Sequence, residues 1–468
     1  MLNENTLQAE NAVPEKENSR GREAIVSLFD AGSFVEMGAY IRRDGENAPY
    51  TAVLCGYGSV DGKLAFAFAQ DTDRISGALD AIGARKIERL YEEAIRVGAP
   101  VVAVLDSAGA VIHDGAEALA AYGRVLKCVS SASGIIPQIA VIGGTCTGLS
   151  AVIASMYDVT ITVKGESNIA FHVAKAPEAD TTPVAESCGL SAINCENRDA
   201  AVHAARDLID LLPRNNRDVA DVEPFDSVTR PVVADGLTGI ALIKAIADRG
   251  RAGRRNVISL YDGFASELCT ALCTIGGRVC GVIATDASEH DGKLTPKGAR
   301  KAARFVSFCD SFSLPIVTLV DSLGVDVSAP REPAPAFGKL AKAYITATTA
   351  KITVTVGNAV GAAFTLLGSR AMGADLTLAL PEAMISPLPP SVAVAFLWND
   401  KITASTPREA VEAEWMATEA SPVRAAESGE IDDIVAPAEL RARLASALYM
   451  LAEKADSTPD RKHGVPTL

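Results

Sequence analysis

The sequence repeats itself with a constant shift of 215 residues. Residues 100–109, PVVAVLDSAG, return as residues 315–324, PIVTLVDSLG. Shorter stretches keep the same shift: Gly83-Ala84-Arg85-Lys86 with Gly298-Ala299-Arg300-Lys301, Asp61-Gly62-Lys63 with Gly276-Gly277-Arg278, and Asp71 with Asp286. Two long copies at a fixed shift indicate a duplicated domain and not a solenoid. A site present once in a single-copy ancestor is therefore expected twice here, in two chemically related versions.

The repeat predicts two domains of similar size within the 468 residues. We expect a loose leader over residues 1–20, a first domain over 21–225 and a second over 226–468, with a linker rich in Pro, Asp, Arg and Asn at 212–236. A hydrophobic content of 48% is ample for two large cores. The net charge of −14 argues against a nucleic-acid partner, because such proteins present a basic face.

The cysteines and histidines predict neither disulfides nor a metal. Nine cysteines occur without a Cys-x-x-Cys pair, and Cys269 and Cys273 are four residues apart on a predicted helix. Reduced core cysteines fit a cytoplasmic protein, and the five histidines lack metal-ligand spacing. The polar N-terminus has no apolar signal region. A run of about 18 apolar residues, which would predict insertion into a membrane, does not occur.

Strands alternate with helices in both copies. Residues 52–70 read as a hairpin with its turn at Asp61-Gly62, followed by a helix over 83–97. The first copy continues with strands at 100–106, 138–143 and 159–163 and a helix at 116–131. The second repeats the order with strands near 279–285, 315–321 and 352–356 and a helix at 296–312. A last helix carries Leu440, Leu444, Leu448 and Leu451. This alternation predicts an α/β fold with short parallel crossovers.

Small residues end two strands in each copy and stand before helices. They are Ala108-Gly109-Ala110 with Thr147-Gly148, and Gly324-Val325 with Val360-Gly361. A ligand can approach such backbone closely, and two N–H groups from neighbouring strands can form an oxyanion hole. The alternative is that these glycines only permit tight packing, and the pattern alone favours neither. Asp106-Ser107 and Asp321-Ser322 are interpreted as strand-end turns and not as nucleophiles.

An arginine cluster is the one local basic feature. It comprises Arg249, Arg251, Arg254 and Arg255. The simpler interpretation is a solvated helix end or linker. The functional one is that Arg254 and Arg255 bind phosphate, as in the tail of CoA.

Longer motifs decide between these interpretations. The chain resembles the carboxyltransferase subunits of biotin-dependent acyl-CoA carboxylases, transcarboxylases and decarboxylases. The resemblance covers about residues 20–450 and is carried by residues 22–36, REAIVSLFDAGSFVE, Ala69-Gln70-Asp71 with Gly77, residues 134–138, GIIPQ, residues 299–310 with 314–316, and residues 421–435, SPVRAAESGEIDDIV. The family's Gly-Gly-Ala-Arg run is Ala108-Gly109-Ala110-Val111 here, its Ala-Gly-Gly run is Thr147-Gly148-Leu149, and its aromatic-Gly-Gly-Ala run is Val360-Gly361-Ala362-Ala363.

The resemblance implies two tandem crotonase-like domains of the β-β-α superhelical type. It implies carboxyl transfer between biotin and the α-carbon of an acyl-CoA, with one oxyanion hole for the thioester enolate and one for the biotin ureido oxygen. The first copy would bind CoA, with Ala110 and Gly148 donating and Gly77 and Ala108 beside the substrate. The second would receive biotin, with Val325 and Gly361 donating. Thr365 would help select the acyl group.

Partners follow from the same resemblance. The chain has no biotinylation motif and no room for an ATP-binding carboxylase module. Biotin would therefore arrive on a carboxyl carrier protein, together with a biotin carboxylase or membrane decarboxylase subunits. A homohexamer with active sites between subunits is expected, and no metal is required.

Two other functions compete with carboxyl transfer. A crotonase-like hydratase, isomerase or decarboxylase would act on acyl-CoA without biotin. A hydratase needs poised carboxylates, for which Asp114 and Glu117 are the candidates, although Glu117 also suits a helix start. A non-catalytic scaffold subunit would show neither CoA affinity nor turnover.

Overall fold

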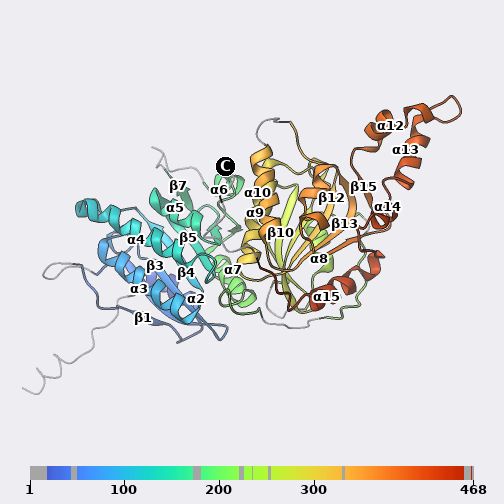
Figure 1. The fold of residues 1–468 in the computed structure, drawn as a ribbon. Helices are drawn as coiled ribbons and strands as arrows, with labels where there is room; N and C mark the ends of the chain where they lie inside the picture. Colours follow the sequence, from blue (N-terminus) through green and yellow to red (C-terminus); the bar gives the residue numbers. More distant parts are fainter. Residues whose placement is uncertain are drawn as a thin grey trace, which may run out of the picture.

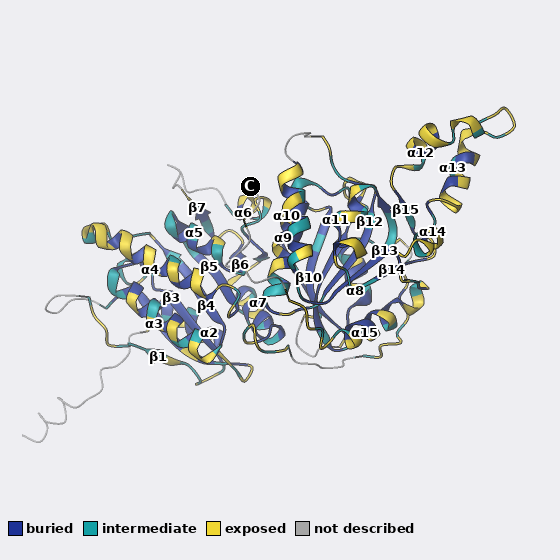
Figure 2. Ribbon diagram, in the orientation of Figure 1, coloured by how far each residue is buried: buried dark blue, intermediate teal, exposed yellow. Residues whose placement is uncertain are grey.

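Two mixed β-sheets, each covered by helices, make up the protein (Figure 1). We describe it from a computed structural model, in which the described residues are 18–43, 50–171, 181–220, 226–234, 236–250, 255–328, 333–457 and 465. The strands are buried, and the helices expose their outer faces (Figure 2). The α/β prediction is confirmed.

The first half contains eight strands and its helices in alternation. Its elements are α2 (Arg20–Leu28), β1 (Val35–Met37), β2 (Val53–Val60), β3 (Lys63–Gln70), α3 (Ala81–Val97), β4 (Val101–Ser107), α4 (Ala116–Ala132), β5 (Gln138–Thr147), α5 (Leu149–Met156), β6 (Val159–Val163), β7 (Asn168–Ala170), α6 (Thr182–Ser187), β8 (Ile193–Cys195) and α7 (Arg198–Leu211).

The second half repeats the strand plan and adds helices near its end. Its elements are α8 (Gly239–Ile246), β9 (Val257–Leu260), β10 (Leu268–Ile275), β11 (Arg278–Thr285), α9 (Pro296–Ser311), β12 (Ile316–Ser322), α10 (Pro333–Thr346), β13 (Lys351–Val360), α11 (Ala362–Leu366), β14 (Leu376–Ala379), β15 (Met384–Ser386), α12 (Pro390–Leu397), α13 (Arg408–Ala417), α14 (Pro422–Glu427), β16 (Asp433–Ile434) and α15 (Leu440–Met450). Helices α12 and α13 project away from the sheet (Figure 1).

The two sheets have the same topology. The first runs β1-β2-β3-β4-β5-β6-β8 with β7 beside β5, and the second runs β9-β10-β11-β12-β13-β14-β16 with β15 beside β13. Both begin with antiparallel pairs and continue in parallel. The structure thus contains the duplication that the 215-residue shift indicates. Between α7 and α8 the described residues form no helix or strand, as expected of a linker.

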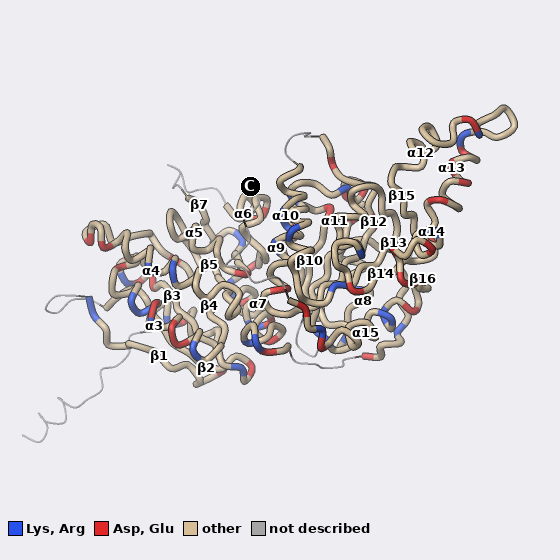
Figure 3. Tube along the Cα trace, in the orientation of Figure 1, with Lys and Arg blue, Asp and Glu red and all other residues tan. Residues whose placement is uncertain are grey.

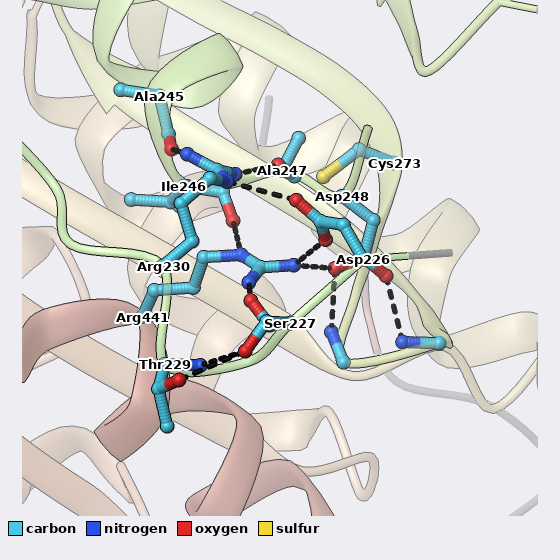
Figure 4. A network of polar contacts seen from close by, with 12 residues as sticks. Asp226, Ser227, Thr229, Arg230, Ala245, Ile246, Ala247, Asp248, Cys273 and Arg441 are labelled. Carbon is cyan, nitrogen blue, oxygen red and sulfur yellow. Dashed lines mark hydrogen bonds and ion pairs between the residues drawn. The ribbon is translucent and has the colours of Figure 1, made fainter. Parts of the chain in front are cut away.

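A carboxylate caps the hairpin turn in each half, and an arginine from the last helix holds it. In the first half Asp30 accepts the N–H groups of Asp61 and Gly62 at 3.0 Å and pairs with Arg206 of α7 at 2.8 Å. In the second, Asp248 accepts the N–H groups of Gly276 at 2.9 Å and Gly277 at 2.7 Å (Figure 4). Arg441 of α15 binds Asp248 there.

Arg441 is the largest fully buried side chain of the described residues. Its guanidinium also contacts Asp226, the Ser227 carbonyl oxygen and, at 3.2 Å, the Ile246 carbonyl oxygen (Figure 4). Arg230 pairs with Asp226 at 2.8 Å as well. Arg441 therefore ties the last helix, the linker end and the hairpin of the second half together.

Two buried lysines occupy equivalent places in the repeat. Lys86 on α3 donates to the Val53 carbonyl oxygen at 2.6 Å. Lys301 on α9 donates to the Tyr261 and Phe264 carbonyl oxygens at 2.8 Å each. Burial lowers the pKa of both ammonium groups, that of Lys301 to about 8. Lys86 thus satisfies a carbonyl group at the start of β2, and Lys301 satisfies carbonyl groups of the loop after the edge strand β9.

Lys301→Met is expected to lower the free energy of unfolding by about 1–3 kcal/mol, because the carbonyl groups of the loop after β9 lose their donor in a buried position. Tyr261 and Ala265 in this loop have positive φ angles of 65° and 53°, so the loop depends on such support. Denaturant titration measures the change. Lys297→Met, exposed on the same helix, is the control and should leave stability unchanged. Equal stability of all three proteins would contradict the role of Lys301.

Contacts between the two halves are polar as well as apolar. The Tyr261 N–H donates to the Ala192 carbonyl oxygen at 2.7 Å, and Arg304 on α9 donates to the Tyr157 carbonyl oxygen at 2.6 Å. One hydrophobic cluster includes residues from both halves, such as Leu208 and Phe305. The halves therefore pack against each other within one chain.

Two local predictions are wrong. Cys269 and Cys273 lie on strand β10 and not on a helix, because tertiary pairing with β9 and β11 decides the conformation of this short apolar run. The strands predicted to end at Gly143 and Val356 continue to Thr147 and Val360. Their extensions pair with the short strands β7 and β15, which have no strong sequence signal.

Candidate active site

The turns after β4 and β12 are held by serine side chains. Ser107 Oγ accepts the Gly109 N–H at 3.1 Å and donates to the Gly109 carbonyl oxygen at 3.3 Å. Ser322 Oγ makes the same two contacts with Gly324, at 3.3 and 2.9 Å. Both serines are buried. Their hydroxyl groups shape the turns, which supports the strand-end interpretation of the Asp-Ser pairs.

The next residue in each turn presents an unpaired amide. Ala110 forms a parallel bridge with Leu79, in which the Leu79 N–H donates to the Gly109 carbonyl oxygen at 2.9 Å and the Val111 N–H donates to the Leu79 carbonyl oxygen at 3.2 Å. In such a bridge the N–H of Ala110 points to the other side. Val325 has the same arrangement with Leu294. Neither amide donates to any residue that the structure describes.

The N–H groups of Gly148 and Gly361 are already used within the sheets. The Gly148 N–H donates to the Ala170 carbonyl oxygen at 3.0 Å, and the Gly361 N–H donates to the Ser386 carbonyl oxygen at 2.9 Å. This geometry corrects the prediction that these two amides are the donors. The pairing with β7 and β15, which sequence reasoning did not find, takes up both.

The free amides next to these glycines belong to Leu149 and Ala362. They are the first residues of α5 and α11, whose opening N–H groups have no partner within the helix. Neither donates to another described residue. Leu149 occupies the position of the second glycine in the Ala-Gly-Gly run of the resembled family. That alignment was the sequence signal that could have identified Leu149 as the donor.

Gly148 and Gly361 determine the direction in which these two helices begin. Their φ and ψ angles are 60° and −128°, and 57° and −132°, so the two copies are nearly identical. This region of φ and ψ is essentially restricted to glycine. The turns of each copy lie close together, since β4 pairs with β5 at Ser107–Cys146 and β12 with β13 at Ser322–Ala359. Each half therefore presents two unpaired N–H groups at the carboxyl ends of adjacent strands.

Carboxylates lie beneath these turns. Asp106 accepts the Thr145 N–H at 3.0 Å, and Asp321 accepts the Asn358 N–H at 2.7 Å. Burial raises the pKa of Asp106. These carboxylates hold the bulged ends of β5 and β13 in place, where a Cβ on Gly144 or Gly357 would lie only 2.4 Å from a carboxylate atom.

The remaining predicted residues divide into three groups. Thr147 and Val360 are buried and pair with Ala170 and Ser386. Gly77 is buried against β4, where a Cβ would lie 2.0 Å from the Asp106 carbonyl oxygen, so its evident role is packing. Ala108 is exposed beside the first turn, and its N–H donates to the Ser76 carbonyl oxygen at 3.0 Å.

A pocket of about 470 Å³ opens at Ala362, one of the two residues of the second amide pair. Its lining includes Gly361, Ala362 and the predicted Thr365, and continues with Phe364, Ile385, Ser386 and Pro387. Thr365 and Ala362 are exposed to it. A pocket of this size and apolar lining is suitable for a small organic group.

Of the arginine cluster, Arg255 has a described contact that is away from the amide pairs. Arg255 forms an ion pair with the buried Asp207 at 3.7 Å. This contact favours the structural interpretation for Arg255. Arg254 and Arg251 lie outside the described residues.

The two candidate hydratase carboxylates differ in their surroundings. Asp114 accepts a hydrogen bond from Arg43 at 3.0 Å, and Glu117 is exposed in the first turn of α4. Across the described ranges, no group of three His, Cys, Asp or Glu residues is placed to hold a metal ion. No helix in the described part of the chain is both long and apolar enough to cross a bilayer.

Fold and site together define an α/β protein with tandem crotonase-like domains, each presenting a pair of backbone amides. Comparison with known proteins then gives the family: the chain belongs to the carboxyl transferase domain family, which matches residues 15–466. Three relatives and structures illustrate the likeness.

The carboxyltransferase subunit of propionyl-CoA carboxylase from Haloferax mediterranei is 30% identical over 492 residues, covering 96% of this chain and 93% of that protein. The methylmalonyl-CoA carboxyltransferase 12S subunit of Propionibacterium freudenreichii subsp. shermanii is 31% identical, with 96% and 92% covered. A transcarboxylase 12S crystal structure with methylmalonyl-CoA and methylmalonic acid bound, described as a hexamer assembly, matches with a TM-score of 0.88 at 29% identity, over 96% of this chain and 92% of that one.

Proposed function

We propose that this protein transfers a carboxyl group between biotin, carried on a separate protein, and the α-carbon of an acyl-CoA. The observation that carries the proposal is the presence of two equivalent pairs of unpaired amides, one in each half, in a member of the carboxyl transferase family. A reaction of a single acyl-CoA needs one oxyanion hole. Carboxyl transfer between an acyl-CoA and biotin involves two carbonyl oxygens that develop negative charge, and therefore two oxyanion holes.

Each amide pair would stabilise negative charge on an oxygen. We assign Ala110 and Leu149 to the thioester oxygen of the acyl-CoA enolate, and Val325 and Ala362 to the ureido oxygen of biotin. Preorganised N–H donors of this kind stabilise charge that develops in the transition state without needing a side-chain acid or base. Biotin would supply the nitrogen that carries the carboxyl group and that accepts the α-proton when the carboxyl group leaves as CO2.

The second pocket fits this assignment. Its volume of about 470 Å³, its small residues and the free Ala362 amide in its lining suit a compact ring with one carbonyl oxygen. Thr365 lines this pocket and remains our candidate for selection of the acyl group. In the proposed assembly it would face an acyl-CoA that is bound by another subunit. Residues 21–225 and 226–468 are the proposed acyl-CoA and biotin domains, and Ala108 stays a proposed neighbour of the substrate.

The proposed partners follow from the relatives. The 12S relative is described as a hexamer, so we propose a homohexamer here, with a biotin carboxyl carrier protein and either a biotin carboxylase or membrane decarboxylase subunits. Because these relatives are a propionyl-CoA carboxylase subunit and a methylmalonyl-CoA carboxyltransferase subunit, we propose propionyl-CoA and methylmalonyl-CoA as the acyl pair.

The proposal is tested by decarboxylation of methylmalonyl-CoA and malonyl-CoA by the purified protein, with and without biocytin. Turnover that requires biocytin is expected. Turnover of the same rate without it would instead favour a crotonase-like decarboxylase. Absence of both turnover and CoA binding would favour a scaffold subunit.

A further inference from the structure

A large cavity lies between the two halves and away from both amide pairs. Its volume is about 600 Å³. The first half contributes the segment Met156–Asp158, which precedes β6, and the loop at Cys188 and Gly189, while the second contributes α9 and α10. The amide pairs lie at the opposite, carboxyl ends of the strands. We refer to this cavity as the inter-half cleft.

Positive side chains dominate the cleft. Arg300, Lys301, Arg304, Lys339 and Lys342 line it, and Asp158 is the one acidic residue among its described lining residues. Figure 3 shows basic segments on α9 where it faces the first half. In a chain with a net charge of −14, such a concentration needs a local reason.

Most of these cations lack an acidic partner. Arg304 donates to the Tyr157 carbonyl oxygen and, at 2.8 Å, to the Tyr261 hydroxyl. Lys342 contacts the Val465 carbonyl oxygen. Arg300 and Lys339 are exposed and make no hydrogen bond or ion pair with another described residue. Arg300 and Lys339 are therefore available to bind an anion, and Arg304 and Lys342 add positive charge beside them.

Asp158 does little to offset this charge. It accepts the Gln138 N–H at 2.8 Å, and burial raises its pKa to about 7. Near neutral pH the carboxyl group is therefore partly protonated. The cleft retains a positive field under physiological conditions.

Aromatic and apolar side chains form the rest of the wall. Phe264, Phe308 and Tyr261 lie in it beside Met156 and Ala303. Rings of this kind stack with a planar group, while the cations beside them favour phosphate oxygens. The volume lies in the range of sites for small organic ligands.

We propose that the inter-half cleft binds a small molecule in which a planar ring carries a di- or polyphosphate group. Because both halves line the cleft, such a ligand would stabilise their packing against each other, in proportion to its concentration relative to its dissociation constant. The proposal does not depend on carboxyl transfer, and its test does not measure activity.

Cys188 provides a direct probe of occupancy. It lines the cleft and is the exposed cysteine, whereas the other eight are buried or half-buried. Its reaction with a thiol reagent such as DTNB should slow in the presence of a bound ligand. The protein is used as the intact full-length assembly.

The experiment measures the Cys188 reaction rate and the heat of binding with ADP, inorganic diphosphate and adenosine. We expect saturating ADP to slow the reaction at least tenfold, diphosphate to act at higher concentration, and adenosine to have little effect. In the double variant R300E/K339E, the ADP concentration needed to protect Cys188 should rise at least tenfold. The control R96E/R443E makes the same change of charge at exposed positions outside the cleft lining. Protection of Cys188 by ADP should be unchanged in this control.

Three results would overturn the proposal. Heat of binding without protection of Cys188 would show that ADP and diphosphate bind elsewhere, for example at a CoA site. Protection that survives in R300E/K339E would show that these cations do not hold the ligand. Absence of both heat and protection would show that the cleft does not bind this class of molecule.

Discussion

Gly361→Ala should lower the turnover of the protein about 10²–10³-fold, the loss seen when one oxyanion-hole donor is removed. A residue with a Cβ is strained at φ 57°, and relief of that strain changes the direction of the Ala362 N–H, which then no longer points at the substrate oxygen. Gly148→Ala should have a comparable effect through Leu149. The steady-state rate of methylmalonyl-CoA decarboxylation with biocytin measures both.

Affinity for the substrate separates this effect from misfolding. Because the amides act on charge that develops in the transition state, the dissociation constant for CoA should change little in either variant. Gly429→Ala and Gly32→Ala are matched controls, since both glycines have a positive φ with open space around them. Full activity in Gly361→Ala, or an equal loss in the controls, would remove the role assigned to these turns.

Arg441→Met should destabilise the protein by about 3–5 kcal/mol, because it leaves the buried Asp248 carboxylate without its cation. The Arg441 side chain is 0% exposed and that of its partner Asp248 is 1% exposed. Besides each other, Arg441 and Asp248 have five further partners in the second half: the Asp226 carboxylate, the carbonyl oxygens of Ser227 and Ile246, and the N–H groups of Gly276 and Gly277 (Figure 4). The midpoint of denaturant unfolding measures the loss.

The first half supplies the comparison. Arg206 plays the same part with Asp30, but its side chain is 16% exposed and that of Asp30 is 31% exposed. Arg206→Met should therefore cost only about 1 kcal/mol, since solvent compensates the freed carboxylate. If the two substitutions were equally costly, burial would not be the cause of the difference.

The repeat predicted most of the fold. The first hairpin, the parallel strands and the helices α3, α4, α9 and α15 lie where periodicity and turn residues placed them, whereas the first strand of the second hairpin does not. The strand-end glycines also marked the correct turns. These features depend on local sequence, which is why the sequence shows them.

Hydrogen bonds over long sequence separations determined the rest. Whether Gly148 or Leu149 offers a free amide depends on Ala170, more than twenty residues away in β7. The extension of β13 past Val356 depends likewise on β15 and on Asp321. The position of Cys273 on a strand follows from its pairing with Cys280 and Val257. None of these pairings leaves a periodic pattern in the chain.

Transfer of a labelled carboxyl group tests the central claim most directly. The protein is incubated with methylmalonyl-CoA labelled with ¹³C in its free carboxyl group, deuterated propionyl-CoA and biocytin, and the CoA esters are analysed by mass spectrometry. We predict that the label appears in deuterated methylmalonyl-CoA only when biocytin is present. Loss of the label as CO2 at the same rate with and without biocytin, and no transfer, would contradict carboxyl transfer through biotin.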